Sequence, residues 1–129
     1  MQQHCVKLLN AYGRDDIEWH HCPNGEQRSK KTAMRLKSLG VKPGVADMPF
    51  LIDGHAFAVE IKTETGVQSK DQKDYQERFT RAGGTYHVAR GLNEAIIVLT
   101  IINAFRPNVR IKSLAYKGSP VRSEPGTAG

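Results

Sequence analysis

The chain has 129 residues, which is enough for one domain with a hydrophobic core but not for two. Apolar residues make up 39% of it, the longest apolar run (Ala95 to Ile102, broken by Thr100) is too short to span a bilayer, and the first residues lack the apolar core of a signal peptide, so we expect no membrane association. The formal net charge of +6 predicts a polyanionic partner, with nucleic acid the first candidate, although charge alone does not establish it.

The first part of the chain predicts a helix, a strand and a loop. Residues 2–12 have a helical apolar pattern that ends at Gly13. Residues 17–21 form a short strand that carries the only tryptophan, Trp19. Cys22 to Gly25 read as a loop, because Pro, Asn and Gly favour turns.

The two cysteines, Cys5 and Cys22, do not belong to a disulfide-rich pattern. We therefore expect a reducing, cytoplasmic setting. Both cysteines lie near histidines (His4, His20 and His21), but the spacing matches no common zinc site, so we expect no zinc.

Residues 27–39 predict a second helix with a basic side, which ends at Gly40. No acid lies between Arg28 and Lys37, so this side is either a solvated surface or a surface that faces phosphates. In the second case the DNA contacts come from this helix and from the start of a later one. These candidates are Arg28, Lys30, Lys31, Arg35, Ser69 and Lys70.

Asp47 to Lys62 predict a β-hairpin, because Asp53-Gly54 favours a two-residue type I′ turn between apolar segments. A turn at this position pairs Ile52 with His55 and Asp47 with Glu60. Pro49 suggests that the first strand is an edge strand or starts late, because proline cannot donate to a ladder. Upstream, Gly44 is expected to allow a close backbone approach or a positive φ.

The hairpin places Asp47, Glu60 and Lys62 on one face. Directly opposed acids repel one another, and a divalent cation such as Mg²⁺ would remove the repulsion. Lys62 could then orient or deprotonate a water molecule, as metal-assisted phosphodiester hydrolysis requires. The alternative is a solvated polar face on a half-exposed hairpin.

Beyond a loop around Gly66, Ser69 is expected to cap a helix that runs to about Ala82. Gln72 either completes the capping box or faces the metal patch and holds a water or phosphate, and the two roles compete for one amide. A strand follows over residues 85–90. Asn93 is expected to cap a last, buried helix from Glu94 to about Phe105.

The order of these elements predicts an α/β fold with a small mixed β-sheet flanked by helices. We expect a single domain over residues 1–105. Residues 106–129 read as a basic, Pro/Gly-containing C-terminal tail that is partly flexible. Within the tail, residues 109–116 could form an edge strand or pack on a partner subunit.

Four motifs occur in a characteristic order: GVAD (44–47), VEIK (59–62), GVQSxxQxxY (66–75) and AGG (82–84). Together they resemble the virus-type replication-repair nuclease domain, VRR-NUC, a branch of the PD-(D/E)XK nuclease superfamily. Residues 21–44 are also similar to stand-alone members of this family from phages and bacteria. The resemblance spans residues 3–103.

The resemblance implies a metal-dependent DNA endonuclease with a PD-(D/E)XK core. Asp47 and Glu60 would bind Mg²⁺ or Mn²⁺, with the backbone carbonyl of Ile61 as a third ligand. Lys62 would position or activate the attacking water, and Gln72 would support the site. The resemblance also implies a homodimer that acts on branched DNA such as four-way junctions, in a role connected with DNA repair.

The chain departs from the family pattern in two ways. Ala46-Asp47 stands where Pro-Asp is usual, and the glutamate expected in the first helix is absent from residues 1–4. Either the sequence given starts beyond that acid or the site has one ligand fewer, and Glu18 is badly placed to substitute. The alternative function is therefore a basic DNA-binding module with weak or no catalysis. A sequence-specific restriction-type nuclease would need a recognition domain, for which we find no room.

Overall fold

The structure is a computed structural model that describes residues 1–23 and 29–109. Some of the sequence predictions fall on residues 24–28 or 110–129 and so lie outside the described residues. These are the loop up to Gly25, Arg28, and the tail beyond Val109.

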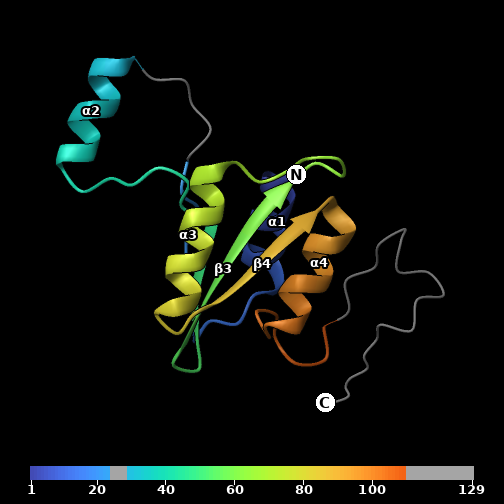
Figure 1. Cartoon of the computed structure of the whole chain (residues 1–129). Coiled ribbons are helices and arrows are strands. Elements are labelled where there is room, and N and C mark those ends of the chain that lie inside the picture. Colours follow the sequence, from blue (N-terminus) through green and yellow to red (C-terminus); the bar gives the residue numbers. More distant parts are fainter. Residues whose placement is uncertain (24–28, 110–129) are drawn as a thin grey trace.

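A four-stranded mixed sheet forms the centre of the molecule, as the sequence predicts (Figure 1). Its strands are β1 (Glu18–Trp19), β2 (Met48–Ile52), β3 (His55–Lys62) and β4 (Thr85–Arg90), in the order β1-β2-β3-β4. The first three strands pair antiparallel, and β3 pairs with β4 in parallel.

The hairpin of β2 and β3 has the predicted turn and register. Asp53 and Gly54 have φ values of 52° and 79°, as a type I′ turn requires. Met48 pairs with Val59 and Ile52 with His55. One residue before Met48, the same register sets Asp47 opposite Glu60.

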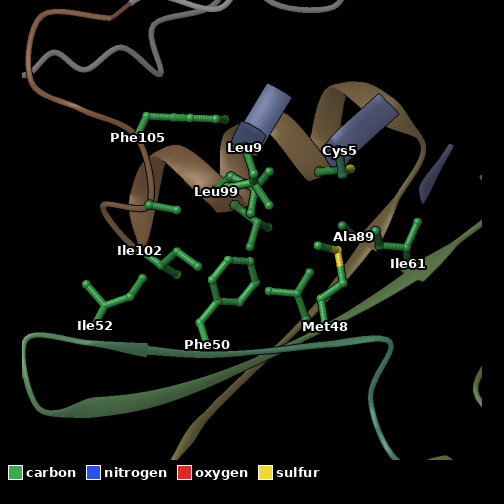
Figure 2. Close-up of a cluster of buried hydrophobic side chains, with 14 residues drawn as sticks. Cys5, Leu9, Met48, Phe50, Ile52, Ile61, Ala89, Leu99, Ile102 and Phe105 are labelled. Carbon is green, nitrogen blue, oxygen red and sulfur yellow. The ribbon is translucent and has the colours of Figure 1, made fainter. Parts of the chain in front are cut away.

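Helices cover both faces of the sheet. On one face α1 (Gln2–Tyr12) and α4 (Leu92–Ile101) pack on the inward side chains of β2 and β3, and Figure 2 shows this core. On the other face lies α3 (Lys70–Arg81), which stands in front of the strands in Figure 1. The core therefore lies between the sheet and the α1–α4 pair, and the face that carries Glu60 and Lys62 is turned toward α3.

The basic helix α2 (Lys30–Ser38) stands apart from the sheet and the other helices (Figure 1). Ser29 caps it by accepting a hydrogen bond from the Thr32 N–H at 3.1 Å. None of the helix's residues is buried. Met34 is 65% exposed.

Four predicted boundaries are wrong. Helix α2 begins at Lys30, after its N-cap Ser29, and not at residue 27. Strand β1 has two residues instead of five, because it pairs only with Phe50 and Leu51 of β2. Helix α4 starts at Leu92, with Gly91 as its N-cap in place of Asn93, and ends at Ile101. The α4 N-cap has a φ of 89°, which glycine adopts without strain.

Pro49 does not mark an edge strand, since β2 lies between β1 and β3. The Pro49 carbonyl accepts a hydrogen bond from His20 at 3.4 Å, so its ring nitrogen faces the same side, beyond the two paired residues of β1. Within residues 1–23 and 29–109, the helices lack the length and apolar character needed to cross a membrane.

Candidate active site

The structure brings Asp47 and Glu60 together under α3. Both side chains are buried, with relative exposures of 7% for Asp47 and 3% for Glu60. Asp47 Oδ2 accepts a hydrogen bond from the Ile61 backbone N–H at 2.8 Å, which ties the segment before β2 to β3. The predicted pair of acids is thus a buried pair rather than a solvated polar face.

Burial and the neighbouring charge of Asp47 raise the pKa of Glu60 to about 7, although the Lys62 ammonium acts in the opposite direction. Glu60 Oε1 is buried and has no hydrogen-bond partner within the part of the chain that the structure describes. A buried oxygen without a partner costs free energy, so this atom is the natural contact for a cation or a proton.

Lys62 lies at the edge of the acidic pair. Its Nζ donates a hydrogen bond to Gln72 Oε1 at 2.7 Å and lies 3.6 Å from Glu60 Oε2. Its side chain is 18% exposed, so the ammonium group remains partly accessible to solvent or to a ligand.

Gln72 completes the capping box and also faces the acidic pair, because the two ends of its amide bind different partners. Oε1 accepts hydrogen bonds from the Ser69 N–H, at 2.8 Å, and from Lys62. Nε2 donates to Glu60 Oε2 at 2.8 Å. The Ser69 side chain in turn accepts from the Gln72 N–H at 3.2 Å, which completes the capping box. The expected competition between the two roles does not occur.

The five described residues among those predicted to contact DNA lie in two separate places. Ser69 and Lys70 begin α3, but the Ser69 hydroxyl is part of the cap, and Lys70 pairs with Asp74 at 2.9 Å. The other three lie on α2, which stands apart from the sheet that carries the acidic pair (Figure 1). Lys30, Lys31 and Arg35 are exposed on α2, and Arg28 lies outside the described residues.

Gln68 and Tyr86 belong to the surroundings of the site and were not predicted. Gln68 Nε2 donates to Gln76 Oε1 at 2.9 Å and to the Tyr86 hydroxyl at 3.3 Å. Burial raises the pKa of Tyr86 to about 12, and the charges of Glu60 and Asp47 add to the shift. The sequence predicts only that Tyr86 belongs to a strand over residues 85–90. Only the parallel pairing of β4 with β3 places it beside the acids.

Two carboxylates are available to a metal ion at this site. Among residues 1–23 and 29–109 there is no group of three or more His, Cys, Asp or Glu side chains placed to hold one. Helix α1 contains no acid, so it does not supply the expected first-helix ligand. Cys5 lies in the hydrophobic core, and Glu18 pairs with Leu51 at the far edge of the sheet.

Comparison with known proteins gives one informative likeness. No protein-family model matches the chain, and the search of curated proteins gave no match. A solved structure described as a "VRR_NUC domain protein" superposes with a TM-score of 0.61 at 22% sequence identity, over 78% of this chain and 85% of that one. The four-stranded sheet with its helices thus has the fold of that VRR_NUC domain protein.

Proposed function

We propose that the protein is a Mg²⁺- or Mn²⁺-dependent deoxyribonuclease that hydrolyses phosphodiester bonds. One observation carries this proposal: Asp47 and Glu60 are buried side by side, and Glu60 Oε1 has no partner among the described residues. The VRR_NUC neighbour supports the proposal at the level of the fold.

The residues present fit a divalent cation. Two buried carboxylates repel each other, and burial together with the charge of Asp47 raises the pKa of Glu60. Their oxygen atoms are the ligands that Mg²⁺ and Mn²⁺ prefer, and such ions are often held by one or two carboxylates together with substrate phosphate. Asp47 and Glu60 would hold the ion, with the carbonyl of Ile61 as a further ligand. When bound, the ion would polarise a phosphate oxygen and stabilise the leaving oxygen.

Lys62 and Gln72 would orient the reacting groups. The Lys62 ammonium can donate a hydrogen bond to the attacking water and offset negative charge that develops on the phosphate. Its bond to Gln72 Oε1 holds it at the edge of the acidic pair. Gln72 Nε2 donates a hydrogen bond to Glu60 Oε2, which leaves Oε1 of the same carboxylate available to bind the ion.

We propose DNA as the substrate because the chain is strongly basic. Helix α2 carries four cations and no acid in the sequence KKTAMRLKS, and its residues are not buried. Lys30, Lys31 and Arg35, with Arg28 just before them, would bind phosphates, and Ser69 and Lys70 would do so at the start of α3. Two further proposals rest on the family resemblance. The protein would be selective for branched DNA, such as four-way junctions in DNA repair, and it would act as a homodimer. We place the activity in the cytoplasm, where the free thiols of Cys5 and Cys22 would stay reduced.

The test is a cleavage panel on linear, flap and four-way DNA with Mg²⁺, Mn²⁺ or EDTA. Asp47→Asn and Glu60→Gln should abolish cleavage and retain or tighten DNA binding, because negative charge is removed from the site. The matched control is Glu77→Gln, which neutralises an exposed acid of α3. Cleavage by Glu60→Gln at the parental rate would overturn the assignment.

A second candidate, a DNA-binding module without catalysis, is favoured by the lack of a third acid at the site among the described residues. Titration with Mn²⁺ by calorimetry separates the two functions. A nuclease site should bind the ion, and Glu60→Gln should lose that binding. A site that has lost its chemistry should bind the ion weakly in the parent as well.

A further inference from the structure

The connector before Asp47 passes very close to the first turn of α3. Gly44 has a φ of +77°, and a Cβ built there would overlap the backbone carbonyl of Asp71 and lie 2.7 Å from the Gln72 nitrogen. These are backbone atoms of a capped helix, so they cannot move aside as the end of a flexible side chain can. Glycine is the residue that permits this approach. The sequence predicted a close backbone approach or a positive φ at Gly44, and the structure has both.

This contact joins the two halves of the candidate site. Asp47 follows Gly44 by three residues, and its carboxylate is tied to β3 through the Ile61 N–H. On the other side of the contact, Gln72 holds Glu60 and Lys62 with its amide. The Gly44 contact therefore fixes the position of the segment that carries Asp47 relative to α3, the helix whose Gln72 holds Glu60.

The first turn of α3 also determines which end of the Gln72 amide faces which partner. Oε1 accepts from the Ser69 N–H and from the Lys62 ammonium, and both of these groups can only donate. Nε2 must then point to Glu60 Oε2. A displacement of this turn would break these bonds and alter the position of the Glu60 carboxylate.

We propose that Gly44 is a positioning residue: its lack of a side chain lets the connector lie against the first turn of α3 and so sets Asp47 in register with the Gln72–Glu60–Lys62 group. Ser69 supports the same register from within the helix by capping the Gln72 N–H. The consequence for metal binding rests on the proposed function, whereas the effect on the Gln72 amide does not.

The experiment compares Gly44→Ala with Gly40→Ala. Both glycines have positive φ, +77° and +90°, so alanine is strained at either position, but at Gly40 no atom lies within 4 Å of the added Cβ. The first readout is the position of the Gln72 side-chain amide signals in ¹H–¹⁵N NMR spectra of the metal-free protein. The second is Mn²⁺ affinity by calorimetry.

Gly44→Ala should move the Gln72 amide signals and weaken Mn²⁺ binding by about tenfold or more, the usual effect of disturbing groups that orient metal ligands. Gly40→Ala should leave the signals in place and the affinity within about twofold of the parent, because its added Cβ contacts nothing near those ligands. Unchanged Gln72 signals in Gly44→Ala would overturn the proposal. If the parent protein does not bind Mn²⁺, the proposed function is wrong. The NMR comparison would still decide the role of Gly44.

A second pair of variants covers the case in which Gly44→Ala does not fold. Ser69→Ala removes the cap on Gln72, and Ser29→Ala removes the equivalent cap on α2, where Ser29 accepts from Thr32 at 3.1 Å. Ser69→Ala should shift the Gln72 amide signals away from their positions in the parent, because the cap on the Gln72 N–H is lost, and Ser29→Ala should not. Equal signals in both serine variants and the parent would overturn the proposal.

Discussion

Gln72 donates a hydrogen bond from Nε2 to Glu60 Oε2 at 2.8 Å, and this bond joins the first turn of α3 to β3, the second strand of the hairpin. The oxygen of the same amide accepts a hydrogen bond from the Lys62 ammonium. A neutral side chain thus holds an acid and a cation in place without adding charge to a buried site. This arrangement makes Gln72 sensitive to substitution.

Gln72→Ala should lower both the cleavage rate and Mn²⁺ affinity, by about 10- to 100-fold for the metal, because Glu60 and Lys62 lose their common partner. Steady-state cleavage and calorimetry measure the two effects. The control is Lys73→Ala, the next residue along α3, whose side chain is exposed. Equal metal affinity in Gln72→Ala and Lys73→Ala would contradict the supporting role of the amide.

The raised pKa of Glu60, from 4.5 to about 7, makes the metal-free protein less stable as the pH rises. Since the folded state holds the Glu60 proton more tightly than the unfolded state, the stabilisation is complete below pH 4.5 and is lost as the pH rises through 7. At ~1.4 kcal/mol per pKa unit, the loss is on the order of 3 kcal/mol. Unfolding in denaturant with EDTA at pH 5 and pH 8 measures it.

Glu60→Gln is the control for this pH dependence, because it keeps the shape of the side chain and removes its titration. The decline of unfolding free energy between the two pH values should be smaller in this variant than in the parent. A parallel decline in both proteins would show that another group is responsible. Saturating Mn²⁺ should stabilise the parent more at the higher pH, where the carboxylate is charged.

The exposed cations of α2 should contribute to DNA affinity through phosphate contacts. Replacing Lys30, Lys31 and Arg35 by alanine should weaken binding to every DNA substrate and lower the salt slope by about three, since each contact contributes about 0.9. Fluorescence anisotropy over a range of salt concentrations measures the slope. Lys7→Ala on α1 is the single-charge control. An unchanged salt slope in the triple variant would show that α2 does not bind DNA.

The sequence by itself determined the features that depend on residues close together in the chain. The Asp53-Gly54 turn and the alternation of side chains were sufficient to align Asp47 with Glu60, because a two-residue turn leaves the hairpin one register. The Ser69 and Gln72 capping box is equally local. Helix α4 shows the limit of such signals. Glu94 accepts a hydrogen bond from the Arg90 N–H at 2.7 Å, so the helix starts before Asn93.

Only the tertiary structure decided how these local pieces meet. The parallel pairing of β3 with β4 brings Tyr86 beside the acids, and the packing of α3 on the sheet buries Glu60 and places Gln72 within reach of it. The contact of Gly44 with the start of α3 depends on the same packing. Burial and the pairing of distant strands result from the arrangement of the whole chain, because the desolvation that raises the pKa of Glu60 comes from atoms far away in sequence.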